Sequence, residues 1–233
     1  MVNYSDIIDN YLFNFTSTKY LQVNNTGCES MIEEMNAIKE CFKNTGNLEK
    51  VLTMCVCNRN GHQYCICNDA VKAAVDRLLD PQGVYGRFYP DAITLGTPVY
   101  ADFEELYHAV KASIGDIGGI GDLTVYDTAK RIGHILPTPI YPKQYVYLSA
   151  GAKEGASKVL GYEPKFREPI DKFSSMFGTL PSIFIEDILC VFKDKFKAPA
   201  PICGCPHYNT DEGGCPFCQL KMTEDNLEDN DNV

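Results

Sequence analysis

Four cysteines near the C-terminus have the spacing of a metal-binding segment. Cys203 and Cys205 form a CGC pair, and Cys215 and Cys218 form a CPFC pair shortly after it. Thiolates this close in sequence can reach one ion, and tetrahedral sulfur sites suit zinc or iron–sulfur clusters. We predict a structural zinc site formed by these four residues, with His207 as a substitute ligand. An iron–sulfur cluster and unligated thiols are the alternatives.

A second group of cysteines lies in the first third of the chain. Cys55, Cys57, Cys65 and Cys67 flank Asn60-Gly61, a dipeptide that favours hairpin turns. Residues at i and i+2 of a strand share a face, so a Cys-rich hairpin would gather the four sulfurs on one side. Metal binding and burial as small apolar side chains are both compatible with this pattern. The cysteines at helical apolar positions are predicted to be buried packing residues: Cys28, Cys41 and Cys190.

A glycine-rich turn offers a third kind of chemistry. Four glycines fall within residues 115–121, and a helical pattern follows them directly. Glycines allow a tight turn and close approach, while the start of a helix presents unpaired N–H groups to an anion. The turn either lets two helices pack or also contacts a phosphate. The predicted nucleic-acid or anion-binding residues are Gly119, Ile120, Gly121 and Thr124.

Other polar residues have simpler predicted roles. Asp127 and Arg131 have the spacing of a solvated helical ion pair. Glu186 and Asp187 follow a helix start, where carboxylates favour the helix dipole. Ser149 is predicted to cap the helix after it. The two histidines near helix ends are predicted to have surface or capping roles: His108 and His134. The sequence contains no P-loop, HExxH or dinucleotide-binding motif, so the catalytic residues stay unassigned.

Composition predicts a cytoplasmic protein with a substantial core. The chain has 233 residues, of which 45% are hydrophobic and 11 are cysteine. No apolar run approaches the roughly 20 residues that span a bilayer. The N-terminus has no basic flank before an apolar stretch, so we expect no signal peptide and no membrane partner. An odd number of cysteines without an export signal favours a reducing, intracellular compartment.

The charge of −10 argues against broad electrostatic attraction to nucleic acid. Five of the acidic residues lie within residues 223–233, which have no basic residue, so the rest of the chain carries about −5 by the same count (−10 + 5). We predict a helical core domain over residues 1–200, which includes a helix-hairpin-helix at 102–133. A Cys-rich metal-binding segment follows at 201–219, and a disordered acidic tail at 220–233.

Apolar periodicity predicts a mainly α fold. Asn47 and Asn68 are well placed to cap helices, and Gly115, Gly133 and Gly161 to end them. Strand candidates are few, and 145–148 is a short apolar run. The predicted helices cover a short helix within 4–23, then 29–42, 48–55, 71–79, 102–113, 122–132, 151–160, 166–177 and 183–196.

The segment from Gly119 to Gly161 resembles the centre of the helix-hairpin-helix DNA glycosylase superfamily. The matching residues are the GIG of the turn, Val125, a Pro-rich link and Leu160-Gly161; some members also carry a late cysteine cluster. The superfamily's catalytic Asp position is Ala150 here. The Lys position of its bifunctional members is Leu123. The resemblance therefore implies the scaffold and its phosphate contact without base excision by that mechanism.

Three functional hypotheses follow. The first is a non-catalytic or catalytically diverged helix-hairpin-helix protein that binds DNA or sits in a nucleic-acid-associated complex, with a structural zinc. The second is an enzyme whose substrate is small and either anionic or base-containing. The third is a structural or interaction protein with a protein partner, which the acidic charge supports.

Overall fold

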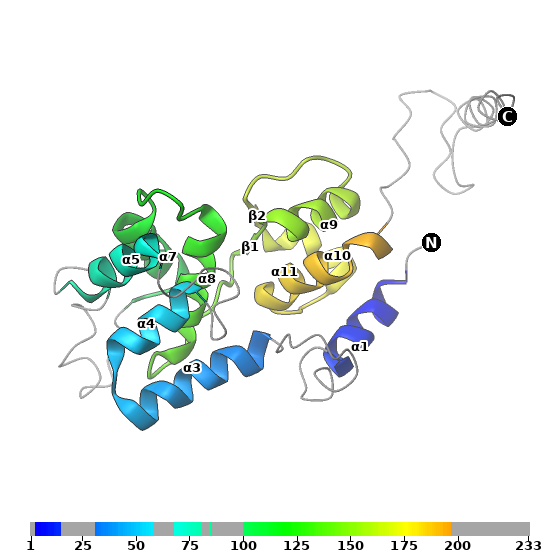
Figure 1. The fold of residues 1–233 in the computed structure, drawn as a ribbon. Helices are drawn as coiled ribbons and strands as arrows, with labels where there is room; N and C mark the ends of the chain where they lie inside the picture. Colours follow the sequence, from blue (N-terminus) through cyan, green and yellow to red (C-terminus); the bar gives the residue numbers. More distant parts are fainter. Residues whose placement is uncertain (1–2, 15–30, 58–67, 81–83, 85–99, 197–233) are drawn as a thin grey trace, which may run out of the picture.

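The computed structural model describes residues 3–14, 31–57, 68–80, 84 and 100–196, and its fold is mainly helical (Figure 1). The only sheet in these residues is a two-stranded antiparallel ribbon. The mainly α prediction is confirmed. The predicted 201–219 segment, the 220–233 tail and the residues between Asn58 and Cys67 lie outside the described residues.

The described residues form helices and two short strands. In chain order they are α1 (Tyr4–Asn14), α3 (Met31–Thr45), α4 (Leu48–Cys57), α5 (Asp69–Leu79), α7 (Phe103–Ile114), α8 (Asp122–Ile135), β1 (Tyr145–Tyr147), α9 (Ala150–Leu160), β2 (Arg167–Pro169), the 3₁₀ helix η1 (Ile170–Phe173), α10 (Ser174–Phe177), α11 (Ser182–Val191) and the 3₁₀ helix η2 (Lys193–Lys195).

Local capping signals set many helix ends. The Asn47 side chain accepts from the amide of Lys50 at 2.9 Å, and Asn68 accepts from Ala70 at 2.8 Å. Both match the N-cap role predicted for asparagine. Gly161 ends α9 in the left-handed conformation, with φ of 77°, as a helix-terminating glycine does. These ends were predictable because each depends on neighbouring residues alone.

The helices pack around two hydrophobic clusters, which we call the first and second lobes. Helices α3, α4, α5, α7 and α8 surround the first cluster. Helices α1, α9, α10 and α11 surround the second. Figure 1 shows the two groups side by side, with α8 on the side of the first lobe that faces α11.

Strand β1 joins the two lobes. Side chains of a strand alternate between its faces. Val146 and Leu148 lie in the core of the second lobe, while Tyr147 lies in the core of the first. The Tyr147 ring stacks on Tyr126 of α8 with centroids 4.6 Å apart. This short strand therefore fixes α8 relative to the second lobe through buried aromatic contact.

Helix α8 is enclosed on every side. All its residues from Thr124 to Ile135 are buried, and α3, α4 and α7 pack against it. The prediction that Gly133 ends this helix is wrong, because α8 continues to Ile135. Gly133 instead allows the following chain to approach: a Cβ at this position would lie 2.4 Å from the Ile140 carbonyl oxygen.

Helices α9 and α11 form the closest pair in the second lobe. A Cβ at Gly155 would lie 2.0 Å from the Leu189 carbonyl oxygen, so the two backbones touch there. A small residue at this position of α9 makes the close packing possible. The predicted helix at 166–177 is instead β2, η1 and α10, and α11 stops at Val191. No helix in the described residues is by itself long and apolar enough to cross a membrane.

Candidate functional site: a charged cleft between the lobes

Three charged side chains of α8 lie inside the protein. Asp127, Lys130 and Arg131 are 8%, 7% and 5% exposed. The prediction of a solvated Asp127–Arg131 pair is therefore wrong, because the surrounding helices cover this face of α8. Buried charges are costly unless they are paired and hydrogen-bonded. An ordinary amphipathic helix buries apolar side chains and exposes its charges, whereas α8 buries three charged side chains.

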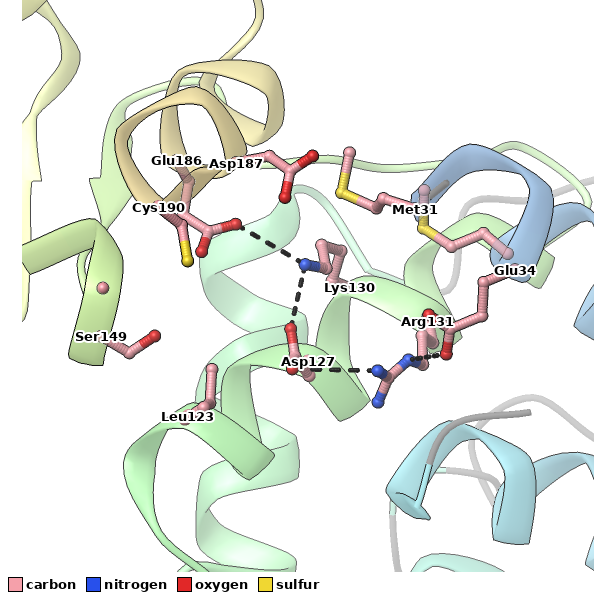
Figure 2. Close-up of a pocket in the computed structure, with 12 residues that line it drawn as sticks. Met31, Glu34, Leu123, Asp127, Lys130, Arg131, Ser149, Glu186, Asp187 and Cys190 are labelled. Atoms are coloured by element: carbon pink, nitrogen blue, oxygen red, sulfur yellow. Dashed lines mark ion pairs between the residues drawn. The ribbon is translucent and has the colours of Figure 1, made fainter. Parts of the chain in front are cut away.

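These charges face a cleft of about 300 Å³ between the two lobes (Figure 2). Small-molecule sites are typically concave pockets of at least about this size, with apolar walls and a few polar groups. The lining residues come from α3 (Met31, Glu34, Met35), α8 (Leu123, Asp127, Lys130, Arg131), the start of α9 (Ser149, Gly151) and α11 (Glu186, Asp187, Cys190).

Lys130 bridges the cleft. Its Nζ lies 2.9 Å from Asp127 Oδ1 and 3.7 Å from Glu186 Oε2. It also lies 4.9 Å from the centroid of the Tyr126 ring. Burial alone disfavours the ammonium, but the charges of Asp127 and Glu186 outweigh it and raise the pKa of Lys130 well above its usual value. Lys130 is therefore a fixed cation and not an amine nucleophile.

Arg131 spreads its guanidinium over three elements. Its Nε lies 3.0 Å from Glu34 Oε1, and its Nη2 lies 3.8 Å from Asp127 Oδ2. Its Nη1 donates to the Cys55 carbonyl oxygen at 2.9 Å. Both cations of the cleft are thus already held by protein carboxylates. A third negative group, such as a phosphate, would have to displace one of them.

Asp187 is held from behind by the first helix of the chain. The Tyr11 hydroxyl is fully buried and donates to Asp187 Oδ2 at 2.6 Å. Burial raises the pKa of Asp187, while the Tyr11 donation acts in the opposite direction. Burial and the Asp187 charge raise the pKa of Tyr11, so the phenol remains a donor. Helix α1 therefore supports a carboxylate of the cleft from behind, although its sequence shows no site pattern.

Glu186 is the most perturbed carboxyl of the cleft. It is 7% exposed, and its Oε2 lies 3.7 Å from Lys130 Nζ, which is longer than a hydrogen bond. Burial raises the pKa of Glu186 to about 8; the charges of Asp187 and Asp127 add to the rise, and Lys130 opposes it. The carboxyl therefore carries a proton at neutral pH. Strongly perturbed groups in clefts are candidates for functional roles.

The helix-dipole explanation predicted for Glu186 and Asp187 is wrong. Helix α11 begins at Ser182, so both residues lie beyond the first turn, where the dipole effect has faded. The sequence did hold a signal: in SIFIEDILC the two carboxylates are flanked by apolar residues on both sides. Acidic residues in the middle of an apolar helix are buried with it. Carboxylates are rarely buried, so a buried carboxylate indicates a functional site more often than an exposed one does.

The glycine-rich turn joins two packed helices, as predicted. Asp102 caps α7, and the turn runs to Gly121, the N-cap of α8, which has no side-chain capping bond. Gly119 has φ of 90°, a conformation that favours glycine. The amide of Ile120, one of the residues predicted to bind an anion, donates to the Ile117 carbonyl at 3.0 Å and is therefore already hydrogen-bonded within the turn. Gly121 is exposed and Thr124 is buried.

Carboxylates accompany the basic side chains at the turn. Arg77 pairs with Asp116, and Lys111 Nζ lies 3.1 Å from Asp122 Oδ1. These pairs neutralise the basic side chains beside the turn.

Leu123 and the start of α9 lie at the same cleft. Leu123 lines it directly, and Ser149 and Gly151 line it on either side of residue 150. Ser149 is the N-cap residue of α9 but makes no side-chain capping bond, so the predicted capping bond is absent.

The Cys-rich hairpin prediction is wrong for its first half. Cys55 and Cys57 lie in α4 and are fully buried, and residues two apart on a helix point in different directions. The Cys57 thiol donates to the Thr53 carbonyl at 2.8 Å. Cys65, Cys67 and the predicted zinc ligands Cys203, Cys205, Cys215 and Cys218 lie outside the described residues. Within the described residues, no group of three or more His, Cys, Asp or Glu could hold a metal ion.

The remaining predicted roles have mixed outcomes. Cys190 is exposed rather than buried, and Cys41 is partly buried. The His134 ring contacts the Tyr141 hydroxyl through Nδ1, and its Nε2 lies 3.0 Å from Asn36 Oδ1. Burial, followed by the Lys39 charge, lowers the pKa of His134 to about 4, so the ring is neutral and structural. His108 is exposed, as predicted.

Comparisons with protein-family models, with curated proteins and with solved structures found no match to this chain.

Proposed function

We propose that this chain is a catalytically diverged helix-hairpin-helix protein that associates with nucleic acid and takes a single base into the cleft between its lobes. The observation that carries the proposal is that Leu123 and the residues beside Ala150 line one cleft. The sequence resemblance links these two positions without any knowledge of the fold. Their convergence on a cavity with buried charges supports a ligand site there.

The charges of the cleft favour a neutral part of the ligand over a phosphate. Four carboxyl groups face two cations: Glu34, Asp127, Glu186 and Asp187 against Lys130 and Arg131. Each cation already contacts carboxylates. An added anion would meet net negative charge in a low-dielectric site. A neutral base between Met31, Met35 and Leu123 would instead bury apolar surface and meet polar groups at its edge.

The backbone at the start of α8 would contact a phosphate of the same strand. Gly121 is exposed at a helix N-terminus without a side-chain cap, which is favourable for an anion. A Cβ at Gly121 or at Gly118 would have no atom within 4 Å, so both positions accept a side chain without a clash. Gly121→Asp should weaken DNA binding, and Gly118→Asp adds the same charge away from the helix start.

Binding to a fluorescent single-stranded oligonucleotide tests the proposal. Leu123 is 36% exposed at the cleft mouth, so Leu123→Trp should fold normally and obstruct entry. Val191→Trp is the matched control, because Val191 is 41% exposed and lies outside the cleft lining. We expect Leu123→Trp to weaken binding by about tenfold or more, as loss of one base contact would. Equal affinity of both variants, or no binding by the unmodified chain at low salt, would reject the proposal.

An acid–base enzyme acting on a small base-containing substrate is the second candidate. The supporting observation is a proton-bearing carboxyl, Glu186, held opposite Asp127 across a fixed ammonium. Two carboxyl groups in unlike environments are the usual means of supplying an acid and a base together. Chromatography of nucleosides incubated with the chain would detect turnover. Turnover that Glu186→Gln leaves unchanged would exclude this role for Glu186.

The C-terminal cysteines complete the proposal. A zinc ion bound by Cys203, Cys205, Cys215 and Cys218 would hold that segment folded. An intracellular, reducing location would keep these thiols available. Elemental analysis of the purified chain should give about one zinc per molecule, as one closed Cys₄ site requires. Iron in place of zinc would instead support a cluster.

A further inference from the structure

Glu186 is a buried carboxyl with room for a hydrogen-bonded ligand. The residue is 7% exposed and lines the cleft between the lobes. The Nζ of Lys130 lies 3.7 Å from Glu186 Oε2, beyond hydrogen-bonding distance. The Glu186 oxygens are not among the fully enclosed side-chain atoms without a partner, so they open onto the cleft, where a ligand can bond to them. Figure 2 shows the carboxyl pointing from α11 toward Lys130 and the cleft interior.

The two carboxyl groups closest to Glu186 already have partners, so Glu186 is the one that can take a new hydrogen bond. Asp127 is engaged by Lys130 at 2.9 Å, and Asp187 accepts from the Tyr11 hydroxyl at 2.6 Å. The ionisable groups that surround Glu186 are Tyr126, Asp127 and Lys130 on α8, Asp187 and Cys190 on α11 itself, and Tyr11 on α1.

We propose that Glu186 selects the ligand of the cleft by pairing, as a neutral carboxyl, with a heterocycle that has a hydrogen-bond acceptor beside a donor. A protonated carboxyl offers an O–H donor and a carbonyl acceptor side by side. A ring nitrogen next to an amino group presents the complementary pair. Two hydrogen bonds form at once, and neither partner is charged. The inference rests on the proposed function, because it assumes that a base enters this cleft.

The protonation state follows from the surroundings. Burial raises the pKa of Glu186 to about 8, so the neutral carboxyl prevails at neutral pH. A carboxylate is an acceptor only and cannot complete the second hydrogen bond. Binding should therefore be strongest below the pKa of Glu186 and weaken above it. An anion such as inorganic phosphate should not bind, since its charge would meet more carboxylates than cations in the cleft even with Glu186 neutral.

Calorimetric titration of the full chain with the 9-methyl derivatives of adenine and purine, called adenine and purine below, tests the inference. Adenine has a ring nitrogen beside an amino group, whereas purine has the same rings without the amino donor, and the methyl group removes the N9–H donor beside N3 from both. Near neutral pH we expect adenine to bind about tenfold or more tightly than purine, as a lost hydrogen-bond pair implies. About one pH unit above the pKa of Glu186, adenine binding should weaken about tenfold. Inorganic phosphate is the anionic control and should give no heat of binding.

Two variants separate recognition from folding. Glu186→Gln keeps a donor and an acceptor at every pH, so it should bind adenine with no loss above the pKa of Glu186. Glu186→Leu keeps the volume but should bind adenine and purine alike. Equal binding of adenine and purine by the unmodified chain, or the same pH dependence in Glu186→Gln, would overturn the inference, as would no adenine binding at all. If oligonucleotide binding still responds to Leu123→Trp, only this inference fails and the proposed function stands.

Discussion

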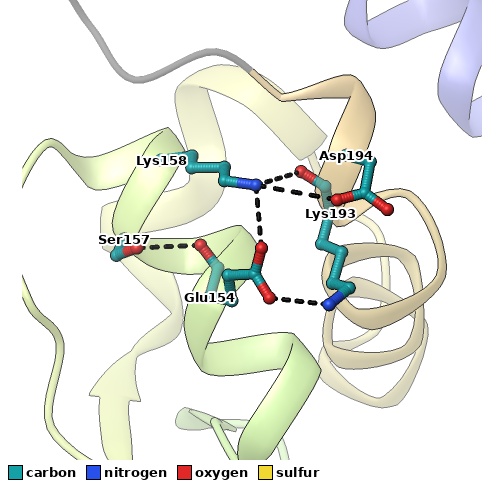
Figure 3. A network of polar contacts seen from close by, with 5 residues as sticks. All are labelled: Glu154, Ser157, Lys158, Lys193 and Asp194. Carbon is teal, nitrogen blue, oxygen red and sulfur yellow. Dashed lines mark hydrogen bonds and ion pairs between the residues drawn. The ribbon is translucent and has the colours of Figure 1, made fainter.

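Two clusters of charged side chains differ in burial. One joins α8 to α11 across the cleft, and the other joins α9 to η2, which directly follows α11. In the cleft, Lys130 joins Asp127 to Glu186 with side chains no more than 11% exposed. At the other cluster, Glu154 of α9 accepts from Lys158 at 2.9 Å and from Lys193 at 2.7 Å (Figure 3). The Glu154 side chain is 43% exposed, so water screens this second cluster.

The difference shows where charge is costly and therefore informative. Exposed ion pairs such as those of Glu154 contribute little to stability and are common on any surface. The buried pairs around Lys130 carry a desolvation cost that well-packed apolar side chains would not. Four acidic and two basic groups around one cleft make the protein less stable there than apolar side chains would. A binding role for the cleft would explain why these charged groups are present.

Removal of the buried cation should have the largest effect. Lys130→Met keeps the length of the side chain but removes the cation closest to Asp127, at 2.9 Å, and leaves the more distant Arg131, at 3.8 Å. We expect a loss of about 3–5 kcal/mol in the free energy of unfolding, as breaking a buried pair does. Urea denaturation followed by circular dichroism measures it.

The matched control is Lys193→Met in the exposed cluster. It removes one cation from Glu154, which retains Lys158. We expect no change in the denaturation midpoint beyond experimental error. Equal destabilisation by the two variants would show that the clusters do not differ as burial implies.

Glu186→Gln should have a pH-dependent effect of intermediate size. Burial raises the folded-state pKa of Glu186 from 4.5 to about 8. Between these values the folded protein holds a proton that the unfolded chain releases, so wild-type stability falls as pH rises. Glutamine has no such proton. Relative to wild type, the variant should gain on the order of 3 kcal/mol between about pH 5 and about pH 8.

Melting curves over this pH range check the prediction. A stability difference between wild type and Glu186→Gln that stays constant with pH would mean that Glu186 is ionised in the folded protein. The comparison of clusters predicts no such pH dependence for Glu154→Gln, because the exposed carboxylate keeps water and both lysines.

Tyr11→Phe should have the smallest effect of the three. The substitution removes only the hydroxyl that donates to Asp187 at 2.6 Å, and the ring stays in the core of the second lobe. We expect a loss of about 1–2 kcal/mol, as for one hydrogen bond to a buried carboxylate. A neutral result in urea denaturation would show that water replaces the phenol, and that α1 does not hold the cleft wall.

The helices were largely predictable because their signals are local. Asn68 caps α5 and Gly161 ends α9 through bonds to residues within one turn. Apolar periodicity also identified the buried face of α11, including Ile185, Ile188 and Leu189. Such features depend on the sequence within a few residues, so they do not change with the packing of the rest of the chain.

The cleft was not predictable because it depends on elements far apart in sequence. Asp127 and Arg131 have the spacing of a surface pair, and only the packing of α3 and α4 buries them. Gly133 stands where a helix could end. Its packing role depends on the following chain, which brings the Ile140 carbonyl against it. Likewise, Tyr11 meets Asp187 only in the folded chain. Local pattern determines a helix, whereas non-local packing determines which of its polar residues are buried.

Methyl NMR of the ¹³C-methionine-labelled chain tests most directly whether a base enters the cleft. Met31 and Met35 line the cleft, whereas Met54 packs against the first core and Met176 against the second. Titration with adenine should shift the methyl signals of Met31 and Met35 and leave those of Met54 and Met176 in place. Unmoved Met31 and Met35 signals at saturating adenine, or shifts confined to Met54 or Met176, would contradict the account.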